Sequence, residues 1–281
     1  MSYALPDSLE EALALRASGD WCVVAGGTDV YPARVETPDG PRGLLDISAL
    51  RTLAAVDKDA THWRIGALAT WTDLINAPLP AGFDALKQAA REVGSVQIQN
   101  VGTVVGNLCN ASPAADGVPP LLVLDAQVEI ASVDATRVVP LGEFIRGNRQ
   151  TILAENELVT AILIPRSHDA APSRFVKLGA RRYLVISIAM VAAQLSVDDQ
   201  GLVDSARVAV GSCSAVAARL PRLEAALQGM RADPGLLDAI DGSLLPELSP
   251  IDDIRASASY RSDAAVEIVR RAVSDCIERI S

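Results

Sequence analysis

The stretch "VVAGGTDVYPARV" (residues 23–35) places two glycines and a hydroxyl directly after a short apolar run. With Trp21 and Cys22 in front, it predicts a strand that enters a turn at Gly26 and Gly27. Glycine allows positive φ and lets another molecule approach the main chain without meeting a Cβ, and the N–H groups of such turns converge on anions. The stretch is therefore either an ordinary tight turn or a phosphate-binding loop.

A second glycine-bearing stretch, "GTVVGNLCNASPAAD" at residues 102–116, follows a predicted helix in "FDALKQAAREVG" (residues 83–94). Gly94 is expected to end that helix in the left-handed conformation. The stretch has too many Gly, Asn and Pro residues for one regular element, so we expect an irregular loop from about Val101 to Asp116. Four of its side chains suit phosphate oxygens and ribose hydroxyls: Thr103, Asn107, Asn110 and Ser112.

Elsewhere the pattern predicts an α+β fold in two domains. Capping boxes are expected at Ser8–Glu11 and Thr70–Asp73. We place the domain boundary near Pro165–Pro172, with residues 1–168 as a first domain that divides into two α+β subdomains near 50–60. Residues 169–281 then form a smaller α+β domain with a three-stranded antiparallel sheet followed by helices.

Composition limits the function classes. The chain has 281 residues, is 49% hydrophobic and carries a net charge of -10, with no long block of basic residues. Nucleic acid and anionic membranes are therefore unfavourable partners. Its apolar runs are too short to span a bilayer and its N-terminus does not resemble a signal peptide, so we expect a cytoplasmic protein. The spacing of the four cysteines suggests neither a zinc site nor an iron–sulfur cluster, and we expect reduced, mostly buried thiols.

The sequence contains neither a P-loop nor a GxGxxG fingerprint, and no GxSxG or HExxH motif. His62 and His168 are its only histidines, and we expect both at the surface. Two phosphate-ready loops without an acid, base or nucleophile set indicate a bound cofactor that brings its own reactivity. We therefore expect a dinucleotide in a non-Rossmann cleft.

The two loops carry a family resemblance. "AGGTDV" at residues 25–30 and "GTVVGNLCNASPAAD" at 102–116, with "IGALATWTDL" between them, resemble the FAD-binding medium subunit of the molybdenum hydroxylases. This is the family of xanthine dehydrogenase and carbon monoxide dehydrogenase. "RFVKLGARR" and "SASYRSDAAVEIVRRAV" are similar to the family's C-terminal domain, so the resemblance covers the whole chain. It implies a two-part FAD-binding domain of the vanillyl-alcohol-oxidase type.

The resemblance also implies site residues. The first loop is expected to wrap the FAD pyrophosphate with Val23, Val24, Ala25, Gly26, Gly27, Thr28, Asp29 and Val30. The second is expected to contact phosphates and ribose through Thr103, Gly106, Asn107, Ser112 and Asp116. Leu158 or Val159 matches an apolar contact near the flavin and adenine edge, and Lys177 matches a basic residue near the isoalloxazine. Because an inward carboxylate would repel the pyrophosphate, we expect that of Asp29 to turn away and accept backbone N–H groups.

Two positions depart from the family's pattern. Val105 replaces the first of two consecutive glycines in the second loop, so the backbone there must suit a β-branched residue. After Arg181 and Arg182 the family has small residues and an aspartate, where this chain has Tyr183, Leu184 and Val185. These differences affect the expected surroundings of the flavin.

The function implied by the resemblance is electron transfer. Substrate is hydroxylated at a molybdopterin centre on a large partner chain, electrons pass through two-iron two-sulfur clusters on a small partner, and non-covalent FAD on this chain passes them to an external acceptor. A dimer of heterotrimers is expected, and no residue of this chain acts as a catalytic acid or base. The alternatives are a free-standing FAD-dependent oxidoreductase with its own small organic substrate, and a nucleotide-binding scaffold.

Overall fold

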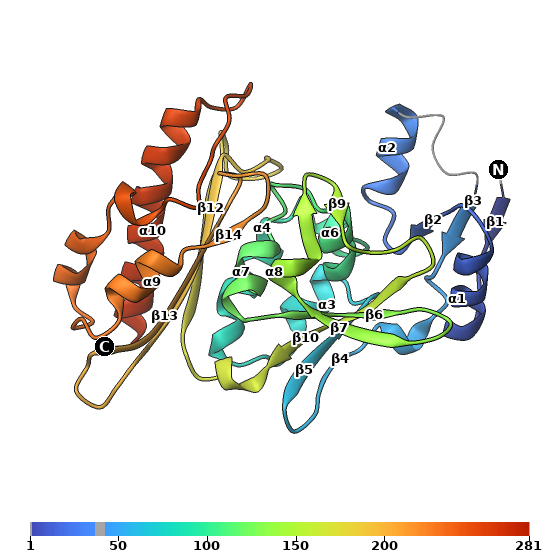
Figure 1. The fold of residues 1–281 in the computed structure, drawn as a ribbon, viewed down its shortest axis with the longest axis horizontal. Coiled ribbons are helices and arrows are strands. Elements are labelled where there is room, and N and C mark those ends of the chain that lie inside the picture. The colour runs from blue at the N-terminus through green and yellow to red at the C-terminus, as the bar shows by residue number, and fades with distance from the viewer. Residues whose placement is uncertain (1, 37–42, 281) are drawn as a thin grey trace. The chain divides into compact units, whose positions relative to one another are not determined.

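The computed structural model describes residues 2–36 and 43–280 (Figure 1). The chain forms two compact units, each built from three segments. Unit 1 consists of Met1–Ala77, Ser95–Ala111 and Ala126–Arg166. Unit 2 consists of Pro78–Gly94, Ser112–Asp125 and Ser167–Ser281.

The first sheet of unit 1 is parallel, in the order β1-β3-β2. Its strands are β1 (Ser2–Ala4), β2 (Trp21–Val24) and β3 (Gly43–Asp46). Helix α1 (Leu9–Ser18) connects β1 to β2, and α2 (Val30–Glu36) follows β2. Ser8 caps α1 as expected, since its Oγ accepts from the Glu11 N–H, but the Glu11 carboxylate accepts from Asp7 instead of Ser8.

The second sheet of unit 1 is antiparallel, in the order β4-β5-β10-β6-β7. Its strands are β4 (Val56–Lys58), β5 (His62–Gly66), β6 (Gln127–Ala131), β7 (Thr136–Pro140) and β10 (Leu158–Pro165). A small hairpin pairs β8 (Ile145–Gly147) with β9 (Gln150–Thr151). The helical elements are η1 (Arg51–Leu53), α3 (Trp71–Asn76), α5 (Val96–Gln99), α6 (Val104–Asn110) and α8 (Leu141–Phe144). Both halves of the expected Thr70–Asp73 capping box are present at α3.

Unit 2 is built on an antiparallel sheet in the order β11-β12-β13-β14. The three long strands match the prediction: β11 (Ser173–Leu178), β12 (Ala189–Val197) and β13 (Val203–Gly211). The prediction of three strands is nevertheless too low, because β14 (Ala218–Arg219) pairs with Ala209 and Val210. Two residues are too few to show an alternating pattern, so the sequence does not indicate this strand.

Alternate side chains of β12 point to opposite faces of the unit 2 sheet, and helices pack on the sheet. Ala189, Val191, Ala193 and Leu195 of β12 join a core formed with α9 (Pro221–Leu227) and α10 (Ala258–Ile280). The other helices of the unit are α4 (Asp84–Glu92), which packs on β11, and α7 (Val118–Val123), which packs on β12 and β13. Short helical turns complete it: η2 (Ala81–Phe83), η3 (Arg166–His168), η4 (Pro234–Ala239) and η5 (Gly242–Leu244). Gly94 has φ 54, as expected at the end of α4.

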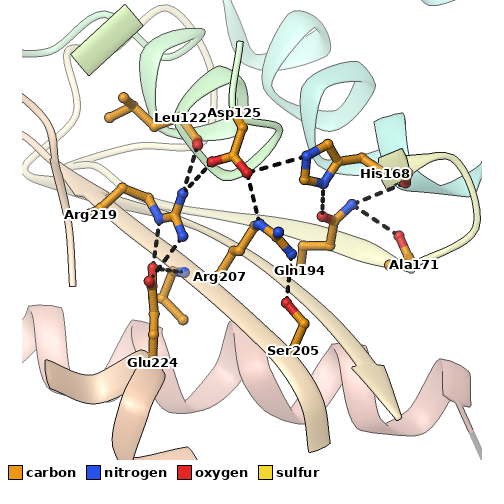
Figure 2. Close-up of polar contacts among 10 residues, drawn as sticks. Leu122, Asp125, His168, Ala171, Gln194, Ser205, Arg207, Arg219 and Glu224 are labelled. Carbon is orange, nitrogen blue, oxygen red and sulfur yellow. Dashed lines mark hydrogen bonds and ion pairs between the residues drawn. The ribbon is translucent and has the colours of Figure 1, made fainter. Parts of the chain in front are cut away.

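His168 is buried, so its predicted surface position is wrong. Its Nε2 lies 3.3 Å from Asp125 Oδ2 and its Nδ1 lies 2.9 Å from Gln194 Oε1 (Figure 2). The Gln194 amide nitrogen donates to the carbonyls of His168 and Ala171, which fixes the orientation of that amide. Both ring nitrogens therefore face hydrogen-bond acceptors, and this polar network compensates the cost of burying the ring. His62 is half-buried.

Asp125 connects His168 to two arginines (Figure 2). Arg207 Nε lies 3.1 Å from Asp125 Oδ2, and Arg219 Nη1 lies 2.8 Å from Asp125 Oδ1. Arg219 also pairs with Glu224 of α9 at 2.6 Å. The network thus joins the end of α7 to β13, β14 and α9.

Candidate FAD site

The first loop turns sharply between β2 and α2. Val24 is buried at the end of β2. After the turn, the backbone N–H of Tyr31 donates to Gly27 O (3.1 Å) and that of Ala33 donates to Asp29 O (3.1 Å). Gly27 has φ 69, a left-handed value that strains any other residue. A Cβ on Gly27 would also lie 2.4 Å from the ring of Tyr31. The side chain of Asp29 is exposed.

The two predicted loops meet in unit 1. A Cβ on Gly26 would lie 1.9 Å from the carbonyl oxygen of Val101, and one on Gly102 would lie 3.4 Å from Thr28 Oγ1. A glycine is therefore needed at position 26 to allow the contact between the two loops. The sequence did not indicate this contact. The segment between the loops joins the same cluster, because Thr70 forms a bridge with Thr103.

The second loop was expected to be irregular throughout. Instead, residues 104–110 form helix α6. Thr103 caps this helix, with its Oγ1 accepting from the Gly106 N–H at 3.0 Å. The helix ends at Ala111, which has φ 47. The sequence did not predict this helix, because it has only seven residues, several of them Gly or Asn, and so short a segment shows no clear helical periodicity. Val105 needs no glycine-like backbone there, because it is a buried helical residue.

Asn107 tests whether these residues suit FAD. Its Oδ1 is buried and has no hydrogen-bond partner among the described residues. Such an atom costs about 1–3 kcal/mol unless a donor reaches it. An amide oxygen accepts hydrogen bonds, and the hydroxyls and ring N–H of FAD are donors, so the second loop fits this cofactor. Of the four cysteines, which were expected to be mostly buried, Cys213 and Cys276 are buried, Cys22 is half-buried and Cys109 of α6 is exposed.

In unit 2, Asp116 and Lys177 form a nearly buried ion pair. Lys177 Nζ lies 2.6 Å from Asp116 Oδ2, and Ser187 Oγ donates to Asp116 Oδ1 at 2.7 Å. Lys177 also donates to the carbonyl of Glu92 at the end of α4. Burial raises the pKa of Asp116, while Lys177 and Ser187 oppose that rise. The carboxylate thus orients Lys177, and Ser187 is a further participant that the sequence did not indicate.

The remaining predicted residues have local roles. Leu158 and Val159 are buried in β10, next to a register shift between Val159 and Ala161. Ser112 Oγ accepts from the Ala114 N–H at 3.2 Å. Unit 1 thus brings together residues 23–30 with Thr103, Gly106 and Asn107 and also contains Leu158 and Val159, whereas Ser112, Asp116 and Lys177 belong to unit 2.

Two known domain families match successive parts of the chain. Residues 1–167 match the family described as FAD binding domain in molybdopterin dehydrogenase. Residues 174–276 match the CO dehydrogenase flavoprotein C-terminal domain. Among the described residues, no helix combines the length and apolar character needed to cross a membrane.

Curated proteins and solved structures give the same picture. The chain is 30% identical to the nicotinate dehydrogenase FAD-subunit of Eubacterium barkeri, over 99% of this chain and 96% of that protein. It is 30% identical to the nicotine 6-hydroxylase medium subunit of Paenarthrobacter nicotinovorans, over 96% and 95%. The structure of reconstituted CO dehydrogenase from Oligotropha carboxidovorans superposes with a TM-score of 0.93 at 26% identity, over 99% of this chain and 98% of that one.

Proposed function

This chain belongs to the xanthine dehydrogenase/CO dehydrogenase family of FAD-binding medium subunits of molybdenum hydroxylases, and from that premise we propose that it transfers electrons through FAD. It is an oxidoreductase subunit with an FAD-binding domain in its first 167 residues. The observations that carry the proposal are the meeting of its two glycine loops at Gly26 and Val101, and the buried Oδ1 of Asn107 in α6, which has no hydrogen-bond partner among the described residues.

The proposed binding mode assigns a task to each loop. Residues 23–30 surround the pyrophosphate, with Gly27 supplying a left-handed turn and Thr28 a hydroxyl. Thr103 and Gly106 shape the start of α6, and Asn107 accepts a hydrogen bond from the cofactor. Bound FAD supplies a redox carrier that accepts and releases two electrons, which no side chain of this chain provides.

We also propose roles for the other predicted residues. Leu158 and Val159 supply an apolar contact, while Ser112 and Asp116 face phosphates or ribose. Lys177, which Asp116 orients, would place its ammonium group near the isoalloxazine. The FAD is held without a covalent bond.

We further propose the partners of this chain. A large molybdopterin chain oxidises the organic substrate, a small chain passes the electrons through two-iron two-sulfur clusters, and FAD delivers them to an external acceptor. The complex is a cytoplasmic dimer of heterotrimers. Relatives described as medium subunits or medium chains support this assembly, among them the carbon monoxide dehydrogenase medium chain of Hydrogenophaga pseudoflava.

Two measurements test this function. Native purification should recover a large molybdenum-containing chain and a small iron–sulfur chain together with this one. Visible spectroscopy of the isolated chain should show flavin that is not bleached by small organic substrates until the partners are added. Bleaching without partners would instead support the free-standing oxidoreductase, and a chain without flavin would support the scaffold.

A further inference from the structure

Arg261 of α10 is almost completely buried in unit 2, with an exposed fraction of 3%. Its Nη1 donates to two backbone carbonyls, that of Ile188 and, at 3.1 Å, that of Ser212. Its Nη2 donates to Asp253 Oδ1 at 2.7 Å. A buried guanidinium needs such partners, and its planar fork fixes their directions. Arg261 therefore connects the residue before β12 to the residue after β13.

The first of these carbonyls belongs to the segment that holds Lys177. The backbone N–H of Ile188 donates to Leu178 O at 2.8 Å, and Leu178 directly follows Lys177 in β11. On the other side of Ile188 in the chain, Ser187 donates to Asp116 Oδ1 at 2.7 Å. A displacement of Ile188 would therefore move both the support of Lys177 and the hydroxyl that orients Asp116.

The second carbonyl belongs to a residue that holds the end of the second loop. The backbone N–H of Ser212 donates to Pro113 O at 3.0 Å. Pro113 lies in the short segment 112–116, which begins with Ser112 and ends with Asp116. Arg261 thus bonds to the neighbours of this segment at both of its ends, through Ser212 near Pro113 and through Ile188 near Asp116.

These positions are not optimised for stability. Arg261 Nε and Ser212 Oγ are buried and have no hydrogen-bond partner among the described residues. Ser212 also has φ 63, a left-handed value that is strained for serine. Arg261 lies in the first turn of α10, where the helix dipole disfavours a cation. Strained and unsatisfied groups of this kind concentrate at functional sites.

We propose that Arg261 is a positioning residue for the flavin. It acts through Ile188 and Ser212, and so fixes where Lys177, Asp116 and the end of the second loop meet the cofactor. This inference rests on the proposed function, under which those residues face FAD.

Fluorescence titration of the apo chain with FAD, together with the visible spectrum of the bound flavin, tests this role. Arg261→Met keeps an unbranched apolar side chain but removes every donor, so the Kd should rise about tenfold and the visible band should shift. Arg261→Lys should give an intermediate Kd, because a single ammonium group does not reproduce the fork that serves three acceptors.

Arg270→Met is the matched control. Arg270 also belongs to α10, and its Nε and Nη2 donate to a backbone carbonyl, that of Ile240. None of the proposed flavin contacts adjoins Ile240. This variant should bind FAD with the wild-type Kd and spectrum, even where its melting temperature falls as far as that of Arg261→Met.

A double-mutant cycle separates positioning from a general effect on packing. If Arg261 acts through Lys177, then Arg261→Met should raise the Kd by a smaller factor in a Lys177→Met background than in wild type. Independent effects would instead multiply in full.

Three results would overturn the proposal. One is a folded Arg261→Met that binds FAD with the wild-type Kd and spectrum. A second is equal weakening of FAD binding by Arg261→Met and Arg270→Met, and a third is full multiplication of the effects in the double-mutant cycle. If Arg261→Met does not fold, Arg261→Lys and Arg270→Lys take the same places in the comparison. A wild type that binds no FAD would refute the proposed function itself, before any variant is compared.

Discussion

Gly26 and Gly27 serve different steric purposes in the first loop. Gly27 provides positive φ, while Gly26 allows the carbonyl of Val101 to approach where a Cβ would otherwise lie. From the sequence alone, both glycines are expected to face a ligand. Gly26 instead faces another loop, and this contact holds the first loop in place.

Replacing Gly26 by alanine should therefore reduce FAD affinity more than tenfold. The new Cβ would lie 1.9 Å from Val101 O, so one loop must move away from the other. Fluorescence titration of the apo chain with FAD measures the change. Gly142→Ala is the matched control, because its Cβ would meet nothing within 4 Å, and it should bind FAD normally. Equal affinities of both variants would refute the role of Gly26.

Asn107 supports a prediction in which two measurements move in opposite directions. Asn107→Leu removes a buried acceptor that has no partner among the described residues, so the apo chain should melt at the same temperature or higher. The same change removes an acceptor for FAD, so the cofactor should bind about tenfold more weakly. A variant that is destabilised without FAD but binds it normally would assign Asn107 to folding alone.

At the scale of elements, long periodic segments were predictable and short ones were not. The three long strands of unit 2 and helix α4 follow from alternation and helical spacing. Helix α6 was not predicted because its seven residues include Gly106 and Asn107. Strand β14 was not predicted because it has only two residues. The burial of His168 depends on Asp125 and Gln194, which are distant in sequence, so no local pattern indicates it.

The Asp125 network predicts a pH-dependent contribution to the stability of unit 2. Burial alone would raise the pKa of Asp125, but the hydrogen bond with His168 and the charges of Arg219 and Arg207 outweigh it and hold the pKa well below its usual value. Because the folded pKa is lowered, the stabilisation is present above the unfolded pKa of about 4 and is lost as pH falls toward the folded pKa.

Asp125→Asn tests this contribution, since asparagine also tolerates the left-handed backbone of this position, φ 47. Urea midpoints should be lower for the variant at pH 7 and should approach those of wild type below about pH 4. A difference that stays constant from pH 7 to pH 3 would show that charge is not the cause.

At the scale of the whole molecule, the chain combines an FAD-binding domain with a C-terminal domain of the same family. Neither compact unit is a single continuous segment of the chain, because residues 78–94 and 112–125 belong to the same unit as the C-terminal sheet. Helices α4 and α7 in these segments pack on that sheet, and β-strand patterns cannot show which distant helix covers a face. The family could be recognised from short loops because their backbone requirements leave little freedom in sequence.

Non-covalent FAD on this chain is tested by the amount of flavin that acid precipitation releases from the purified chain. Wild type should release one FAD per chain into the supernatant, and Gly26→Val should release almost none while melting cooperatively. A folded wild type that releases no flavin, or flavin that stays with the precipitate, would contradict an electron-transfer subunit built around non-covalent FAD.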